Sequence, residues 1–472
     1  MQLDLHCRPS SGPPVRVGVA GVGEFGASLA ARGRYQPQLS VDAFADLEVD
    51  AALARLQAAG IARDAVEVCD SLPRALAALR AGRKVLVSDA MLLVQLPLQV
   101  LVEATGHAEA AAACAEAAIA QGQHVVMVTK EADSVVGPLL HDLARRAGVV
   151  YTPVDGDQPS LLIKLVGWVQ ALGARIVAAG KASEYDFVYD PRAGTLASQG
   201  RTVQAPDLAG LWELGADGVA TVAARAQALP QFVRVSVPDL CELGVVANAT
   251  GLLPDVASMH APIARTLELP DLFCPRADGG LFSREGVVDS FNCLRRPDEL
   301  SFAGGVFVVA DLGDDATFRV LQGKGIPASR QGSRLLLYNP THLLGVEATI
   351  SILSAAILQR STLGDTVRPR VDLVARATRD LPAGTRLAIA HQHTHALADM
   401  QPLLMPAAPA ALDDAAPLPY YMAVGQVLSR AVRAGEMLTA AALHKPVASA
   451  LWRLRAAQDQ RFLSKAPAGT VA

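Results

Sequence analysis

Residues 15–26 read Val-Arg-Val-Gly-Val-Ala-Gly-Val-Gly-Glu-Phe-Gly, and this stretch decides the fold of the chain. Its first half is apolar enough for a buried strand. Its second half, Gly21 to Gly26, is a G-x-G-x-x-G motif that leads into an alanine-rich segment over 27–32. Glycines at this spacing allow a tight turn, a close approach of a pyrophosphate to the backbone, and close packing of helix on strand. The stretch therefore predicts a dinucleotide-binding unit with the phosphates at a helix N-terminus.

The next predicted strand, 39–45, ends in Asp46, about twenty residues after the glycine motif. An acid at this position is typical of a contact to the 2'-hydroxyl of the cofactor ribose. Asp46 favours NAD because its charge repels a 2'-phosphate, whereas Arg32 and Arg34 leave NADP open. The predicted cofactor contacts are Gly21, Gly23, Glu24, Phe25, Gly26, Asp46, Thr105, Gly106 and Lys130.

Strands and helices continue to alternate after residue 98. A strand over 99–103 is followed by the loop 104–106, a helix over 107–120, and a strand that ends in Thr129-Lys130-Glu131. This alternation predicts an α/β fold, a Rossmann-type doubly wound parallel sheet. Ligands bind outside the carboxyl ends of such strands, where Lys130 would lie.

Another apolar run, 149–154, is followed by Asp155-Gly156-Asp157-Gln158. Two carboxylates separated by a glycine can turn toward one divalent cation, Mg²⁺ or Mn²⁺, because hard metals prefer carboxylate oxygens. The alternative is a solvated turn in which Asp157 caps the helix that Pro159 begins. Both interpretations stay open at the level of the sequence.

A predicted strand over 174–179 ends in the polar segment 180–186. Within it, Lys181 can polarise a carbonyl or hold a substrate anion, and Glu184 can complete a carboxylate metal set with Asp155 and Asp157. The alternative is a salt-bridged turn. The predicted catalytic residues are Lys130, Lys181 and Glu184, and the predicted metal ligands are Asp155, Asp157 and Glu184.

Two families share these motifs. Residues 103–106 (Glu-Ala-Thr-Gly), the helix that follows and Thr129-Lys130 resemble the nucleotide domain of homoserine dehydrogenases, where a lysine at this point lies by the nicotinamide. Residues 129–132 and 153–158 resemble 1-deoxy-D-xylulose 5-phosphate reductoisomerase, whose acidic pair binds a divalent metal. Thr129, Asp157 and Gln158 depart from that pattern, in which Asn, Glu and His occupy these places. The combination resembles the reductoisomerase-like family, which implies a C-terminal SAF domain.

The C-terminal region contains two versions of one sequence pattern, 375–385 and 428–436, each with a turn through Ala-Gly. They resemble a SAF domain, a small β-rich fold. His391, His393 and His395 alternate here, which is a weak indication of a metal site. The expected domains are 1–150 with a return helix at about 340–362, 151–335 for the substrate and 366–472 for the SAF-like module.

Composition limits the possible partners. The chain has 472 residues, 51% hydrophobic and 19% charged, with a formal net charge of -4. This balance argues against nucleic-acid binding, and charged or polar residues interrupt the most apolar span, so no membrane helix is expected. Six dispersed cysteines without a C-x-x-C pair are typical of a reduced, cytoplasmic protein. We expect a small-molecule substrate and a homo-oligomer.

The sequence as a whole predicts an NAD(P)-dependent oxidoreductase or reductoisomerase that acts with metal assistance on a small polyhydroxylated substrate, a sugar phosphate or sugar acid. One alternative is a homoserine-dehydrogenase-like oxidoreductase without rearrangement. Another is a non-catalytic nucleotide-binding sensor or assembly protein. Dependence on metal separates the first two, and turnover of NAD(P)H separates both from the third.

Overall fold

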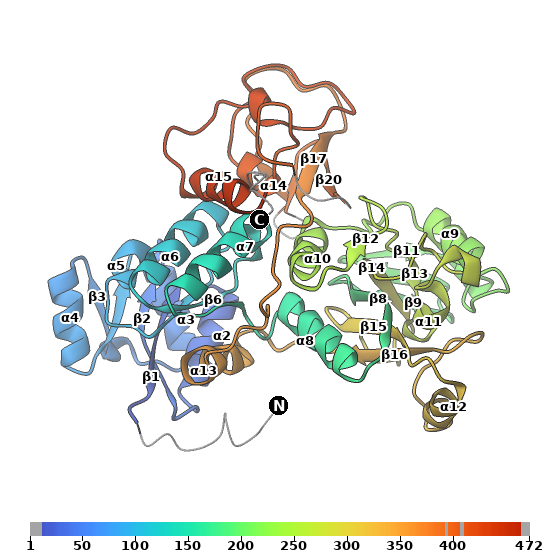
Figure 1. The fold of residues 1–472 in the computed structure, drawn as a ribbon, viewed down its shortest axis with the longest axis horizontal. Coiled ribbons are helices and arrows are strands. Elements are labelled where there is room, and N and C mark those ends of the chain that lie inside the picture. Colours follow the sequence, from blue (N-terminus) through green and yellow to red (C-terminus); the bar gives the residue numbers. More distant parts are fainter. Residues whose placement is uncertain (1–11, 392–394, 406–409, 464–472) are drawn as a thin grey trace, which may run out of the picture.

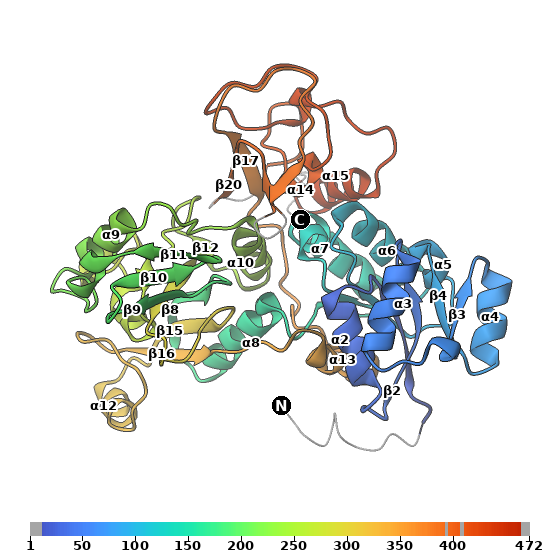
Figure 2. The same ribbon diagram turned by 180° about the vertical axis from the view of Figure 1, so that it is seen from behind.

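The computed structural model describes residues 12–391, 395–405 and 410–463. The chain forms three parts, with a nucleotide-type sheet and a second sheet side by side and a smaller C-terminal part above both (Figure 1). Helices α8 and α10 lie between the two sheets (Figures 1 and 2). No helix in the described ranges is long and apolar enough to cross a membrane.

The first sheet has seven strands in the order β3-β4-β2-β1-β5-β6-β7, all parallel to their neighbours. The strands are β1 (Val15–Ala20), β2 (Leu39–Ala45), β3 (Val66–Cys69), β4 (Lys84–Val87), β5 (Val100–Glu103), β6 (His124–Met127) and β7 (Tyr151–Pro153). The helices are α2 (Glu24–Gly33), α3 (Val49–Ala58), α4 (Leu72–Arg80), α5 (Ala90–Val94), α6 (Ala108–Ala120) and α7 (Lys130–Arg146). This confirms the predicted Rossmann-type α/β fold.

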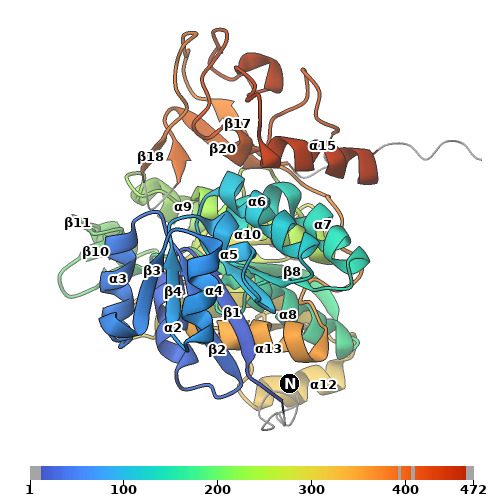
Figure 3. The same cartoon turned by 90° about the vertical axis from the view of Figure 1, so that its left-hand side faces the viewer.

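Helices cover both faces of the first sheet, which explains why its strands are almost continuously apolar. On one face Val17 and Val19 of β1 pack with Ile352 and Leu353 of α13 (Ala348–Leu358). Helix α13 therefore returns from the second sheet to the first, as expected from the sequence (Figure 3). On the other face, α6 and α7 pack against each other.

The second sheet follows the order β11-β10-β9-β14-β8-β15-β16 and mixes parallel and antiparallel pairs. Its strands are β8 (Arg175–Ala182), β9 (Phe187–Asp190), β10 (Thr195–Ser198), β11 (Arg201–Gln204), β12 (Leu253–Pro254), β13 (Ile263–Ala264), β14 (Val287–Arg295), β15 (Val306–Asp311) and β16 (Arg334–Asn339). Its helices are α8 (Gln158–Ala171), α9 (Gly218–Ala228), α10 (Val237–Thr250), α11 (Leu269–Leu272) and α12 (Asp315–Gly323).

Strand β8 extends beyond the predicted limit of residue 179. Lys181 pairs with Ser290 of β14 and with Val306 of β15, so it lies inside a central strand. The prediction that Lys181 belongs to a loop at the end of the strand is wrong. Strand β8 continues through this polar segment because its two neighbouring strands pair with it, and such tertiary pairing cannot be recognised from the polar sequence alone.

The C-terminal part contains β17 (Leu373–Ala377), β18 (Ile389–His391), β19 (Ala396–Leu397), β20 (Met400–Leu404), α14 (Tyr420–Ala423) and α15 (Ala450–Phe462). The two related sequence segments meet in it, because Leu381 and Val432 exchange backbone hydrogen bonds. Its SAF identity stays a prediction. Helix α15 packs on α6 and α7 (Figure 3).

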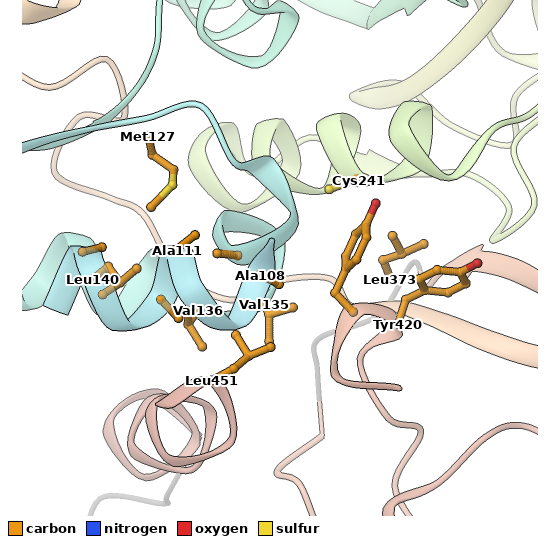
Figure 4. Close-up of a cluster of buried hydrophobic side chains, with 14 of the residues drawn as sticks. Ala108, Ala111, Met127, Val135, Val136, Leu140, Cys241, Leu373, Tyr420 and Leu451 are labelled. Carbon is orange, nitrogen blue, oxygen red and sulfur yellow. The ribbon is translucent and has the colours of Figure 1, made fainter. Parts of the chain in front are cut away.

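One continuous core joins the C-terminal part to the rest of the molecule. Figure 4 shows Val135 and Val136 of α7 and Cys241 of α10 near Leu373, Tyr420 and Leu451 of the C-terminal part. All six side chains are buried. The C-terminal part is therefore packed against helices of both neighbouring parts.

Candidate functional site

The glycine loop after β1 has the geometry that a dinucleotide requires. Gly21 has φ +92°, and a Cβ on it would lie 2.2 Å from the carbonyl oxygen of Ala104. A Cβ on Gly26 would lie 2.2 Å from the carbonyl oxygen of Gly21, so helix α2 can approach β1 only with glycine here. A Cβ on Gly23 would meet nothing within 4 Å. The loop thus leaves open space where a pyrophosphate would approach the backbone.

Asp46 lies at the end of β2 and braces the same loop. Its Oδ2 accepts a hydrogen bond from the Val22 N–H at 2.8 Å, and its Oδ1 accepts one from the Glu48 N–H at 2.9 Å. Each carboxylate oxygen has a second lone pair that can accept from a ribose hydroxyl. Glu24 is exposed at the start of α2, and Phe25 is half-buried beside it. These residues fit an NAD(P) cofactor.

A cleft of about 220 Å³ lies at the carboxyl ends of β5, β6 and β7. Of the predicted catalytic and metal-binding residues, Lys130, Asp157 and Glu184 line it. The substrate side of the cleft comes from the start of α8, from the segment after β8 and from the segment after β16. The lining residues are Phe25, Ala104, Gly106, Val128, Thr129, Lys130, Glu131, Asp157, Gln158, Glu184, His342 and Leu344.

The loop after β5 is fixed by hydrogen bonds. The Thr105 hydroxyl donates to Glu103 Oε1 at 2.6 Å, and the Gly106 N–H donates to Thr129 Oγ1 at 3.0 Å. Glu103 is fully buried, and burial raises the pKa of its carboxyl to about 7, although the hydrogen bonds from Thr105 oppose the shift. The loop thus positions Gly106 at the cleft.

A buried carboxylate joins the two predicted lysines. Glu242 of α10 forms ion pairs with Lys130 through Oε1 and with Lys181 through Oε2. Lys130 is the first residue of α7, lines the cleft and has a side chain 20% exposed, whereas the Lys181 side chain is only 1% exposed. The residues therefore form a chain from the cleft into the interior, in the order Lys130, Glu242, Lys181.

Two further carboxylates complete this cluster. Asp239, one turn before Glu242 on α10, lies 2.8 Å from Lys181 Nζ, and Asp157 lies 3.5 Å from Lys130 Nζ. Asp239 also takes part in a capping box with Ser236, which fixes the start of α10. Each lysine thus faces two carboxylates.

The carboxylates keep both lysines charged. Burial alone would lower the pKa of Lys130, but Asp157 and Glu242 outweigh it and hold that pKa well above its usual value. The pKa of Lys181 is raised in the same way, since Asp239 and Glu242 outweigh burial. Burial raises the pKa of Glu242, and the two lysines oppose that shift. Glu242 is therefore easier to protonate than Asp239, whose pKa Lys181 lowers against the opposing effect of burial.

The predicted metal ligands do not come together. Asp155 is buried and accepts from Lys164 Nζ at 2.5 Å, Ser160 Oγ at 2.8 Å and Ser351 Oγ at 3.0 Å, so it ties α8 and α13 to β7. It does not line the cleft. Within the described ranges, no three His, Cys, Asp or Glu side chains are grouped to hold a metal ion. The set of Asp155, Asp157 and Glu184 therefore does not fit a divalent cation.

Asp157 and Glu184 do reach the cleft. Asp157 accepts a hydrogen bond from the Gln158 N–H at 2.9 Å and caps α8, which confirms the helix-cap interpretation. Glu184 is exposed at the edge of the cleft. His342 lines it from the second part of the molecule, whereas Glu347 accepts a hydrogen bond from the Leu343 N–H.

Sequence reasoning missed Asp239 and Glu242. They stand three residues apart on α10, whose residues from Val237 to Ala249 are all buried. Two acids on a helix buried all round are costly unless each is paired, and this pattern could have marked them. Of the three alternating histidines, His393 and the side chain of His391 lie outside the described residues, and His395 pairs with Glu131 at 3.3 Å.

Comparisons with known proteins match two adjacent parts of the chain to family models. Residues 36–153 match the model "Homoserine dehydrogenase, NAD binding domain", and residues 156–348 match "Oxidoreductase DRL, catalytic domain". The chain joins these two kinds of domain. In these two parts it is similar to NAD-binding oxidoreductases. A search of curated proteins found no match.

The solved structures to which this chain is similar are distant. The 1-deoxy-D-xylulose 5-phosphate reductoisomerase from Zymomonas mobilis, in complex with NADPH, is 19% identical, with 36% of this chain and 46% of that chain covered and a TM-score of 0.26. The scyllo-inositol dehydrogenase from Lactobacillus casei is 11% identical, with 69% and 76% covered and a TM-score of 0.33. The chain covers less than half the length of the reductoisomerases that it matches.

Proposed function

We propose that this protein is an NAD(P)-dependent oxidoreductase that transfers hydride between NAD(P) and a hydroxyl-bearing or carbonyl carbon of a small polyhydroxylated substrate, in the cleft that Lys130 lines. Polar side chains from both sheets support this substrate class. Lys130, Asp157, Gln158, Glu184 and His342 all line the cleft and can bind hydroxyl groups.

The observation that carries the proposal is the ion-pair chain Lys130–Glu242–Lys181 at the cofactor edge of the first sheet. When a carbonyl accepts hydride, its oxygen gains negative charge, and an ammonium beside it stabilises that charge. A bound nicotinamide supplies or accepts the hydride. The raised pKa of Lys130 keeps its Nζ protonated. That Nζ can therefore donate a hydrogen bond to the substrate oxygen.

Glu242 and Lys181 hold Lys130 in place. Glu242 is 1% exposed, so its charge acts in a water-poor environment, where it orients Nζ of Lys130 strongly. If Nζ gives its proton to the substrate oxygen, the neutral amine can take up another proton from the cleft. Meanwhile the positive charge of Lys181 balances the negative charge of Glu242. Lys181 is thus a positioning residue rather than a substrate contact.

A rearrangement assisted by Mg²⁺ or Mn²⁺ stays a second candidate, and the match of residues 156–348 to the DRL catalytic domain favours it. The described carboxylates do not supply the predicted ligand set. Simple hydride transfer is the function that the geometry supports better.

Both candidates can be tested by NAD(P)H turnover against a panel of sugars, sugar acids and sugar phosphates, with EDTA or with Mg²⁺ and Mn²⁺. We expect turnover in EDTA, and we expect the product to keep the carbon skeleton of the substrate. Lys130→Met should lower kcat about a hundredfold or more, while Lys324→Met, at an exposed lysine that does not line the cleft, should leave it unchanged. Turnover only with metal and with a rearranged carbon skeleton would favour the second candidate. No turnover in any condition would refute both.

A further inference from the structure

A second cavity, of about 290 Å³, lies between the starts of α6 and α7 and the C-terminal part. Gly106 and Glu131 line it from the nucleotide side. His395, Tyr421, Gln426 and Trp452 line it from the C-terminal part. Leu451 of α15, which Figure 4 shows next to Val135 of α7, is one of its lining residues.

This cavity adjoins the catalytic cleft, because Gly106 and Glu131 line both spaces. Glu131 follows Lys130 directly in α7. Its carboxylate is nearly buried and pairs with His395 of the C-terminal part at 3.3 Å. A molecule that contacts Lys130 in the cleft is thus close to Glu131, the next residue of α7, which the C-terminal part contacts through His395.

The walls select against negative charge. They contain the carboxylates of Glu109 and Glu131 and, among the described residues, no lysine or arginine. Glu109 is held by the Ser449 hydroxyl at 2.5 Å and the Ala450 N–H at 2.6 Å, so it cannot turn away. A phosphate or carboxylate here would face like charges without a lysine or arginine to offset them.

The same walls suit hydroxyl groups. Glu131, His395 and Gln426 offer hydrogen-bond acceptors and donors, and the rings of Tyr421 and Trp452 add apolar faces. Burial, followed by the nearby Cys241 and Glu131, raises the pKa of Tyr421 well above its usual value, so this residue stays a neutral phenol. Few polar groups on an otherwise apolar wall are typical of a small-molecule site.

Size also indicates that the two spaces act together. The cleft of about 220 Å³ has to hold the nicotinamide end of the cofactor as well as the reacting carbon. We propose that the substrate extends from the cleft into the second cavity, and that the C-terminal part binds its distal end, which is uncharged and bears hydroxyl groups. This inference rests on the proposed function and assigns the C-terminal part a role in substrate selection.

Filling the cavity tests the inference. Ala448 lines the cavity and is exposed, so Ala448→Trp can narrow the space without disturbing the core. The matched control is Ala434→Trp, an exposed alanine of the same part outside the cavity lining. Steady-state kinetics with NAD(P)H would compare the three-carbon probe D-glyceraldehyde with D-xylose and D-glucose, and D-glucose with D-glucose 6-phosphate.

We expect Ala448→Trp to raise KM for the five- and six-carbon sugars by about tenfold or more, with little change for D-glyceraldehyde, for the Kd of NAD(P)H or in the control. D-glucose 6-phosphate should be a poorer substrate than D-glucose. An equal effect of Ala448→Trp on short and long probes, no effect on either, or better turnover of the phosphate would overturn the inference and leave hydride transfer intact. No turnover of any probe by the wild type would overturn the proposed function together with this inference.

Discussion

Asp155 and Asp157 are two residues apart, yet their carboxylates serve different sites. Asp155 is buried against Lys164 of α8 and Ser351 of α13, whereas Asp157 caps α8 and lies 3.5 Å from Lys130 Nζ in the cleft. Gly156 separates them with φ +91°, and a Cβ there would lie 1.9 Å from the Leu344 carbonyl oxygen. The glycine turn sends one carboxylate into the core and the other toward the lysine.

This difference predicts opposite effects for two similar substitutions. Asp155→Asn should lower the free energy of unfolding by about 1–2 kcal/mol, because it removes the negative charge from the ion pair with Lys164, whose side chain is partly exposed. The kcat of this variant should change little. Asp157→Asn should lower kcat more than stability, since it weakens the charge that holds Lys130. Urea unfolding and steady-state kinetics of both variants measure this. A large loss of kcat in Asp155→Asn, with normal stability, would restore its predicted metal role.

Gly23 should decide cofactor binding. Its φ of -75° suits any residue and no protein atom lies near its Cβ position, so Gly23→Val should fold normally. The new side chain would occupy the space for the pyrophosphate, and the affinity for NAD(P)H should fall by at least about a hundredfold. Fluorescence titration measures this. Gly167→Val, at an exposed glycine of α8 with equally open space, serves as the control. Unchanged affinity in Gly23→Val would refute the placement of the cofactor.

Asp46 should decide between NAD and NADP. Asp46→Asn keeps an acceptor for the Val22 N–H but removes the negative charge beside the ribose. We expect the ratio of kcat/KM for NADP over NAD to rise by roughly tenfold or more, because a like-charge contact with the 2'-phosphate disappears. A wild type that already prefers NADP strongly would contradict this role of Asp46.

Asp133 of α7 should make stability depend on pH. Its carboxyl is buried and accepts from the Tyr151 hydroxyl at 2.9 Å. Burial raises its pKa from 3.8 to about 7, and the Tyr151 hydrogen bond only partly opposes this. Because the pKa of Asp133 is higher in the folded protein than in the unfolded chain, protonation of Asp133 favours the folded state. This contribution to the free energy of unfolding is fully present below about pH 4 and is lost as the pH rises through 7.

Asp133→Asn keeps an acceptor for Tyr151 and cannot ionise. Relative to wild type, the variant should therefore gain stability between pH 5 and pH 8, by at most roughly 3 kcal/mol. Urea unfolding at both pH values measures the difference. The variant should retain some pH dependence, because burial also raises the pKa of Glu103 to about 7 and of Asp289 to about 6. Equal pH dependence in both proteins would contradict a buried, ionisable Asp133.

The first sheet could be predicted because its determinants are local. The apolar run 15–20 and the glycines at 21, 23 and 26 set a strand, a turn and a helix within twelve residues. The return helix was also foreseeable, since residues 348–358 are mostly apolar. For the cleft, Lys130 and Asp157 were found because each lies within four residues of the end of a strand of the parallel sheet.

The central carboxylate was not foreseeable. Glu242 lies 112 residues from Lys130 and 61 from Lys181, and only the packing of α10 against α7 and α8 brings the three together. A buried acid is tolerated when cations neutralise it, and such partners have no fixed spacing in a sequence.

The sequence by itself determined the nucleotide-type sheet, its glycine loop and the positions of Lys130 and Asp157, because periodicity, turns and strand ends are short-range properties. Tertiary structure alone decided that Asp155 points into the core, that Lys181 lies behind Glu242 and that the C-terminal part walls a cavity beside the cleft. These features depend on contacts between segments far apart in the chain, where the cost of burying a charge is balanced by whichever partner the fold brings near.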